Sequence, residues 1–214
     1  EIGTPLNSLS GHLQLLQGDI KDTASAGRLS VIGSQVARIE GIVREFLAST
    51  HSPIEQKQLV DVREVIERIV RLVAPRTASL GISVRCDFSA ELEPIRIVPT
   101  DLEQVLLNLA NNAMDALAHS EGTRALRFSC EVLEGEKAGR SLRIGVRDSG
   151  EGIAPERLKD VIKPFYTTKA PGQGTGLGLP ICVRLVRRYG GQLEVESDLG
   201  KGTVIWIRIP YDAV

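Results

Sequence analysis

The sequence has few cysteines, few aromatic side chains and almost no net charge. Its three cysteines, Cys86, Cys130 and Cys182, lie far apart and show no CxxC spacing, which argues against a disulfide framework or a zinc site. The 26 basic residues nearly balance the 27 acidic ones, so bulk charge predicts no nucleic-acid partner and no attraction to a membrane surface. No apolar run approaches the roughly 18 residues of a membrane span. We therefore expect a cytoplasmic chain without direct membrane contact, which is compatible with a longer parent protein that has a membrane anchor.

The first quarter of the chain is patterned as two helices joined by the polar segment 18–27. In each helix, apolar residues recur at spacings of three and four, as in the heptad seam of a coiled coil. One hairpin cannot cover both seams, so we expect two hairpins to pair into a four-helix bundle, which makes the protein a homodimer through residues 1–50. Alternatively, the hairpin packs on the rest of its own chain. The seams are Ile2, Leu6, Leu9, Leu13, Leu16 and Ile20, and Leu29, Ile32, Val36, Ile39, Val43 and Phe46.

The rest of the chain has a mixed helix and strand pattern. A polar stretch around Pro53 is a plausible hinge, so we predict a hairpin domain, 1–52, and a second domain, 53–214. The predicted strands are 58–62, 81–88, 95–99, 124–133, 141–148, 191–197 and 202–209. The predicted helices are 62–74, which Pro75 should stop or kink, a helix capped by Thr100 and Asp101 that ends at Ala118, and one between Gly174 and Tyr189. The fold class is therefore α+β, with an α/β sandwich whose helices cover one face of a mixed sheet.

Three polar residues share one face of the helix that contains "NLANNAMDAL". Asn108, Asn112 and Asp115 follow one another at i, i+4 and i+7. A face that packs on a sheet should not carry three polar groups unless something polar lies opposite. The alternative is a solvated face.

The stretch "VRDSGEGI" places a carboxylate at a strand end beside two glycines. Asp148 can accept a hydrogen bond from an amino group such as that of adenine, and Gly150 and Gly152 let the backbone approach a ligand closely. Alone, the same residues are also compatible with a plain turn.

A glycine-rich stretch, "PGQGTGLGLPICVRLV", leads into a helix. Free backbone N–H groups at the positive end of a helix form an anion site, most naturally for phosphate. The stretch lacks the spacing of a Walker A loop and of GxGxxG. The irregular segment 153–172 before it carries Thr168 close by and fits a nucleotide lid. The glycines are Gly172, Gly174, Gly176 and Gly178.

The order of these motifs resembles that of the histidine protein kinases. The Asn-rich helix resembles the N box, DxGxG and GxGxG the glycine boxes, "KPFYTTK" the F box, and "GKGT" the last glycine box. The resemblance covers essentially the whole chain. It implies the Bergerat-type ATP-binding fold, which DNA gyrase, the MutL proteins and a heat-shock chaperone share. Those ATPases carry a glutamate as general base where this chain has Asn108, which favours a kinase over an ATPase.

The resemblance also implies a role for each motif. Asp148 binds the adenine amino group, and Asn112, assisted by Asn108, holds Mg²⁺ against the phosphates of ATP. Relatives often carry a basic residue where this chain has Asp115, so no phosphate contact is expected there. The phosphate cradle is Gly174, Thr175, Gly176, Leu177 and Gly178. The remaining ATP-site residues are Gly150, Gly152, Thr168, Lys169 and Thr203.

The chain begins with glutamate inside a helical pattern, so we expect a fragment of a longer protein. "EIGTPLNSL" resembles the H box, H-E-x-x-[NT]-P-L, without its first residue. The resemblance implies that the phosphoacceptor histidine precedes Glu1, that Glu1 is the neighbouring base, and that Thr4 positions water for dephosphorylation of a response regulator receiver domain. Structurally, Thr4 and Pro5 also fit a helix start. The competing functions are a nucleotide-binding regulatory module or phosphatase, and a Bergerat-type ATPase.

Overall fold

The computed structural model describes residues 25, 32, 56–135, 139–169 and 174–211. Residues 56–163 and 178–211 form one compact unit, and the segment 164–177 is described by itself. Apart from Ser25 and Ile32, the predicted hairpin lies outside the described residues, as do Glu1 and Thr4. The hairpin, the dimer and the domain boundary therefore stay predictions.

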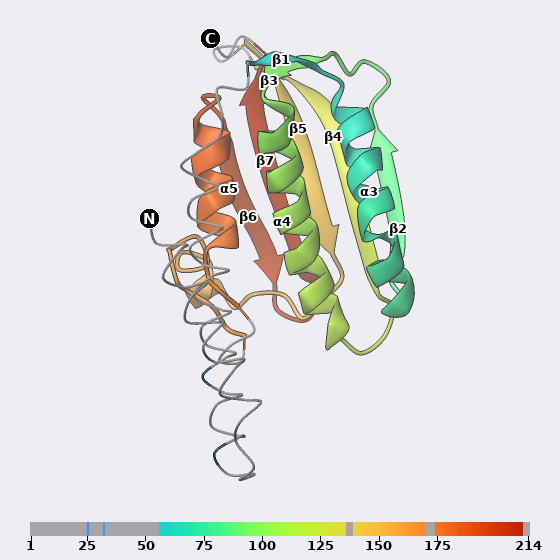
Figure 1. The fold of residues 1–214 in the computed structure, drawn as a ribbon, viewed down its shortest axis with the longest axis vertical. Coiled ribbons are helices and arrows are strands. Elements are labelled where there is room, and N and C mark those ends of the chain that lie inside the picture. Colours follow the sequence, from blue (N-terminus) through green and yellow to red (C-terminus); the bar gives the residue numbers. More distant parts are fainter. Residues whose placement is uncertain (1–24, 26–31, 33–55, 136–138, 170–173, 212–214) are drawn as a thin grey trace. The chain divides into compact units, whose positions relative to one another are not determined.

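A five-stranded sheet forms the base of the compact unit, in the order β2-β4-β5-β7-β6 (Figure 1). β2 pairs with β4 in parallel, and the other pairs are antiparallel. β1 and β3 form a separate two-stranded antiparallel sheet. The elements are β1 (Gln58–Val60), α3 (Val62–Ser79), β2 (Ser83–Phe88), β3 (Ile95–Ile97), α4 (Pro99–Ala118), β4 (Ala125–Gly135), β5 (Gly139–Asp148), the 3-10 turn η1 (Pro155–Arg157), α5 (Gly178–Arg187), β6 (Gln192–Asp198) and β7 (Gly202–Pro210).

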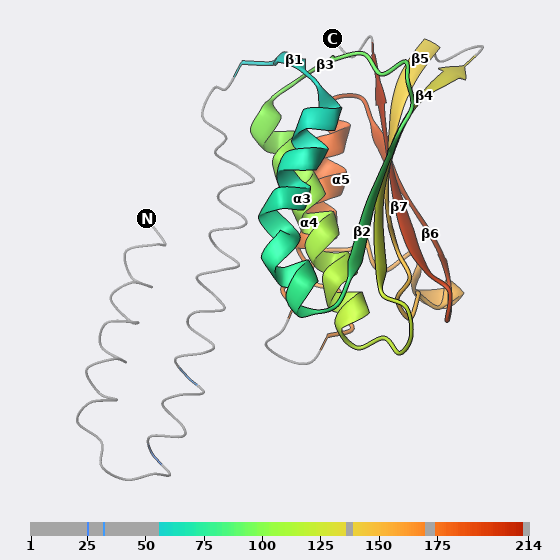
Figure 2. The same cartoon turned by 90° about the vertical axis from the view of Figure 1, so that its right-hand side faces the viewer.

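The helices α3, α4 and α5 all cover the same face of the sheet (Figure 2). Alternation along β5 explains this layering, because Leu142, Ile144 and Val146 are buried while Arg143 and Arg147 point to the other face. α4 lies in the middle, and its apolar side is fully buried against the sheet. The predicted α/β sandwich with helices on one face of a mixed sheet is confirmed. No helix of the described residues is long and apolar enough to cross a membrane.

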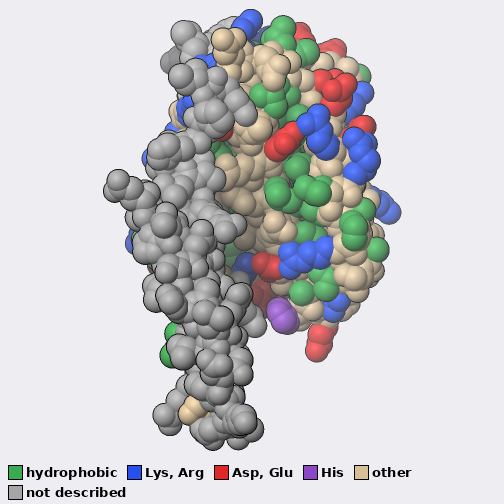
Figure 3. Space-filling model, viewed as in Figure 1, with side chains coloured by type: hydrophobic (Ala, Val, Ile, Leu, Met, Phe, Trp, Pro, Cys, Tyr) green, Lys and Arg blue, Asp and Glu red, His purple; other side chains and the backbone are tan. Residues whose placement is uncertain are grey.

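The outward side of the helical layer carries charged side chains. Away from the part drawn in grey, acidic and basic side chains lie interspersed on this face (Figure 3). Arg68 of α3 pairs with Glu103 of α4, and Arg71 lies 3.9 Å from Glu67. Such partly exposed pairs contribute little to stability individually, but they mark this side of the helices as solvated.

Three predicted helix boundaries are wrong. α3 runs through Pro75 to Ser79, because Val73 and Thr77 continue its buried face beyond the proline. Thr100 and Asp101 do not cap α4, which begins at Pro99. Proline suits the first helical position, where its missing N–H is not needed. α5 ends at Arg187, two residues before Tyr189.

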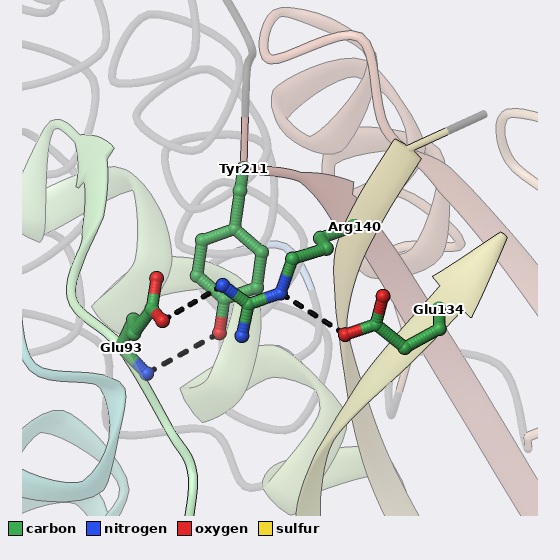
Figure 4. Close-up of polar contacts among 4 residues, drawn as sticks. All are labelled: Glu93, Glu134, Arg140 and Tyr211. Carbon is green, nitrogen blue, oxygen red and sulfur yellow. Dashed lines mark hydrogen bonds and ion pairs between the residues drawn. The ribbon is translucent and has the colours of Figure 1, made fainter.

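A polar cluster joins the turn end of the β4–β5 hairpin to Tyr211, the last described residue (Figure 4). The Arg140 guanidinium lies 2.7 Å from Glu93 and 3.2 Å from Glu134, and its carbon lies 5.4 Å from the centre of the Tyr211 ring. The Glu93 N–H donates to the Tyr211 hydroxyl at 3.4 Å. The cluster thus ties the β2–β3 connection to the end of the sheet.

Candidate functional site

Asp148, the last residue of β5, is a buried carboxylate. Its side chain accepts hydrogen bonds from the backbone N–H groups of Gly150, at 2.8 Å, and Thr203. Burial raises the pKa of Asp148, and the two N–H donors and the nearby Arg147 oppose that rise. The carboxylate is held in place by backbone, so its remaining acceptor capacity is available to a ligand donor.

Glycines surround Asp148 because the backbone approaches it closely. A Cβ atom on Gly150 would lie 2.8 Å from Asp148 Oδ1 and 3.1 Å from the Ala116 Cβ of α4. Gly152 has a φ of +72°, and a Cβ there would overlap the Asp198 carbonyl. The strand end, its following turn and α4 therefore meet without space for side chains.

Ser197 of β6 connects the same loop to β7. Its hydroxyl accepts from the Ile153 N–H at 2.8 Å and lies 2.9 Å from the Thr203 hydroxyl. It also donates to the Gly202 carbonyl at 2.8 Å. Ser197 is not predictable from the sequence, because a lone serine in a strand gives no signal of a role. Ser197 links Thr203 to the glycine turn beside Asp148.

Asn108 and Asn112 lie on α4. The Nδ2 atom of Asn108 is buried and has no hydrogen-bond partner in the part of the chain that the structure describes. Asn112 faces α5, since its Nδ2 lies 3.7 Å from where a Cβ on Gly178 would stand. A buried N–H donor without a partner is costly unless a ligand supplies an acceptor, so the Asn108 Nδ2 points to a missing acceptor oxygen.

Asp115, the third polar residue predicted on that face, has a structural explanation. It pairs with Arg76 of α3, whose guanidinium also donates to Asn111 at 3.1 Å. The ion pair joins α3 to α4 and does not require a ligand.

Gly178 is the first residue of α5. The first N–H groups of a helix have no partner within the helix, and its dipole favours negative charge there. The N-terminus of α5 lies beside Asn112, which places an amide next to a helix end that favours negative charge. This pairing is the polar centre of the candidate site.

The segment 164–177, which carries the other predicted phosphate residues, is joined near its two ends by a backbone hydrogen bond. The Phe165 N–H donates to the Gly176 carbonyl at 2.9 Å, and Phe165 and Gly176 have φ values of +65° and +66°. The Leu177 N–H donates to the Thr175 hydroxyl at 3.2 Å. The described parts of this segment also contain Thr168, Lys169 and Gly174, and none of them is placed relative to Asp148 or the two asparagines.

The donor set near the helix end suits Mg²⁺. Amide oxygens are hard ligands, and Mg²⁺ usually keeps waters and binds substrate phosphates with one or two protein ligands. Asn108 and Asn112 supply two amides, and no group of three or more His, Cys, Asp or Glu side chains in the described ranges forms a dedicated metal cage. The amide oxygens of the two residues would fit Mg²⁺ bound together with a nucleotide, whereas their Nδ2 atoms are hydrogen-bond donors that suit a phosphate oxygen.

Comparison with known proteins identifies a family for this chain. Residues 97–213 match the family described as histidine kinase-, DNA gyrase B- and HSP90-like ATPase. Sporulation kinase D of Bacillus subtilis (strain 168) is 33% identical, over 100% of this chain and 40% of its own length. The sensor histidine kinase ZraS of Escherichia coli (strain K12) is 32% identical, over 99% of this chain and 44% of its own length. The chain thus spans less than half the length of these relatives.

Solved structures share the fold. Full-length ShkA in complex with AMPPNP has a TM-score of 0.74 and 28% identity, and the match covers 100% of this chain and 44% of that one. The histidine kinase ThkA in complex with the response regulator protein TrrA has a TM-score of 0.68 and 21% identity, over 99% of this chain and 59% of that one.

Proposed function

Because the chain belongs to the family of histidine kinase-, DNA gyrase B- and HSP90-like ATPases, we propose that it is the kinase core of a two-component sensor histidine kinase. In this proposal it binds Mg-ATP, moves the γ-phosphoryl group to a histidine, and passes that group to an aspartate of a response regulator. The named kinases among its relatives support this reading within the family.

The observation that carries the proposal is the placement of Asn108 and Asn112 on α4, with Asn112 beside the N-terminus of α5. Asn108 is an amide at the position where the resemblance puts the general base of the ATPases. An amide cannot take a proton from water at neutral pH. Phosphoryl transfer to a protein acceptor needs mainly positioning and charge neutralisation, which these groups supply.

The adenine and the phosphates of the nucleotide each have a matching group in this proposal. The Asp148 carboxylate, which the Gly150 N–H holds in place, accepts from the adenine amino group. Asn112 and Asn108 hold Mg²⁺, which neutralises phosphate charge when it is bound. The N-terminus of α5 attracts the phosphates, and Lys169 and the Gly174–Gly178 stretch complete the cradle.

The remaining steps of the proposal depend on residues outside the described part of the chain. Glu1 assists the histidine that we expect before it, and Thr4 positions water for dephosphorylation of the regulator. Residues 1–50 form the homodimer. A related fold solved with a response regulator supports a receiver domain as the partner. We place the chain in the cytoplasm, where its nucleotide and its partner are found.

Nucleotide titration tests the binding half of the proposal. Isothermal calorimetry with AMPPNP and Mg²⁺ should give one saturable site per chain, and Asn112→Ala should abolish the Mg²⁺-dependent part of the affinity. Asn111→Ala is the matched control, because Asn111 is the adjacent amide and contacts Arg76 instead. Absence of binding by the unsubstituted chain would refute the proposed site.

A further inference from the structure

The N-terminal end of α4 lies beside the C-terminal end of α5 in space, and a buried carboxylate joins the two ends. Asp101, in the first turn of α4, is only 2% exposed. It accepts a hydrogen bond from the Tyr189 hydroxyl and lies 3.0 Å from the Arg188 guanidinium. The Tyr189 hydroxyl in turn accepts from the Val98 N–H at 3.2 Å. Burial and the Asp101 hydrogen bond both raise the pKa of Tyr189, so the phenol keeps its proton and remains the donor.

The other ends of the same helices meet at the candidate site. There Asn112 of α4 faces Gly178, the first residue of α5. From Asp101 to Asn112 the chain rises about 16 Å, and from Gly178 to Arg188 about 15 Å. The two helices are therefore antiparallel, and a shift at the Asp101 end moves the Gly178 end by the same amount.

The contacts between these two ends do little to fix that register. They are mainly apolar, and a small cavity of about 10 Å³ borders Leu102, Leu185 and Ile207 beside the cluster. Apolar packing is non-directional, whereas hydrogen bonds to a buried carboxylate have one geometry and specify a register. The Cys182 thiol of α5 also donates to the Val105 carbonyl of α4 at 3.8 Å, but a thiol is a weak donor, so the charged cluster at Asp101 supplies the stronger directional contacts.

We propose that Asp101, Arg188 and Tyr189 are positioning residues for the nucleotide site, because they fix α5 lengthwise against α4 and so hold the N-terminus of α5 beside Asn112. The inference rests on the proposed function, since it assigns these residues to the same site. None of the three touches the nucleotide in this account. They act through the two helices.

A pair of tyrosine substitutions tests the inference. Tyr189→Phe removes the hydroxyl that binds Asp101, and Tyr211→Phe removes a hydrogen-bonded hydroxyl that lies in the other polar cluster, beside Arg140 (Figure 4). Calorimetric titration with Mg-AMPPNP should show that Tyr189→Phe weakens binding about 5-fold or more. Tyr211→Phe should bind like the unsubstituted chain.

Two further measurements separate positioning from plain stability. Urea unfolding shows how much each tyrosine variant is destabilised, and a purely structural role predicts unchanged affinity in any variant that stays folded. Hydrogen exchange of the amides that follow Gly178 should be faster in Tyr189→Phe and unchanged in Tyr211→Phe. If Tyr189→Phe does not fold, Arg188→Gln, which keeps the hydroxyl bond, should show the same loss of affinity in weaker form.

The outcomes distinguish this inference from the proposed function. If the unsubstituted chain binds Mg-AMPPNP and Asn112→Ala does not, the site is correct. If Tyr189→Phe and Arg188→Gln then bind with unchanged affinity, the positioning role is refuted alone. If the unsubstituted chain does not bind the nucleotide, both are refuted.

Discussion

The Gly150 N–H donates a hydrogen bond of 2.8 Å to Asp148 Oδ1, and a Cβ atom on Gly150 would lie 2.8 Å from the same oxygen. The residue that orients the carboxylate therefore has to be one without a side chain. Backbone supports the end of the site where we propose that adenine binds, so a single methyl group should disturb it.

Gly150→Ala should weaken nucleotide binding about 10-fold or more, because the added methyl displaces a charge-assisted hydrogen bond. Gly81→Ala is the control. Gly81 has a φ of +64° and nothing within 4 Å of an added Cβ, so this change should lower stability through backbone strain without changing affinity. Equal affinities for the two variants in a Mg-AMPPNP titration would contradict this account of Asp148.

Asp148→Asn should separate stability from binding. Burial raises the pKa of Asp148, so the ionised carboxylate is less favourable in the folded than in the unfolded chain. The resulting loss of folding stability is absent below the ordinary pKa of aspartate. It grows as pH rises from that value through the raised pKa of the folded chain. At neutral pH the variant should therefore melt higher than the unsubstituted chain without nucleotide, and the difference should disappear in acid.

The same substitution should weaken Mg-AMPPNP binding about 10-fold, because a hydrogen bond to a charged acceptor is lost. Thermal unfolding with and without nucleotide measures both effects. A variant that melts lower and binds normally would show that the carboxylate is a structural group.

Asn108→Ala should change the stability of the folded chain little but weaken nucleotide binding strongly. Its buried Nδ2 has no partner among the described residues, so removal of the amide relieves a penalty that partly offsets the cavity it leaves. We expect the free energy of unfolding to change by about 1 kcal/mol or less. The loss of nucleotide affinity should be larger with Mg²⁺ than with a chelator. A variant with the same affinity in both conditions would exclude Asn108 from the metal site.

The ion pair between Arg76 and Asp115 should be independent of the nucleotide. Both side chains are partly exposed, at 45% and 29%, so a double-mutant cycle should give a coupling of about 1 kcal/mol or less. Neither Arg76→Ala nor Asp115→Ala should change the affinity for Mg-AMPPNP. A decrease with Asp115→Ala comparable to that of Asn112→Ala would place Asp115 in the phosphate site.

Local patterns in the sequence predicted the layers of the fold. The predicted hairpin strands 124–133 and 141–148 correspond to β4 and β5, and the glycines around Asp148 predicted close backbone there. These features depend on neighbours in the sequence, so the pattern contains them. The class of the sheet, with helices on one face, followed from the order of the elements.

Long-range contacts determine the features that the sequence did not predict. Asp101 is a good N-cap residue by type, yet it is buried against Arg188 and Tyr189, more than 80 residues away in the sequence. Pro75 does not end α3, because the buried face continues to Thr77. Ser197 gained its role only from the turn that folds back on it. No local pattern encodes such partners.

The central claim is that this chain is a histidine kinase core, and phosphoryl transfer tests it most directly. A chain that carries a histidine ahead of Glu1, where the H-box resemblance puts the phosphoacceptor, should be incubated with Mg²⁺ and ATP labelled at the γ-phosphate. The account predicts one acid-labile, alkali-stable phosphoryl group per chain, on the residue before Glu1, and none with Asn112→Ala. Steady release of inorganic phosphate by a chain that never becomes labelled would contradict it and identify an ATPase instead.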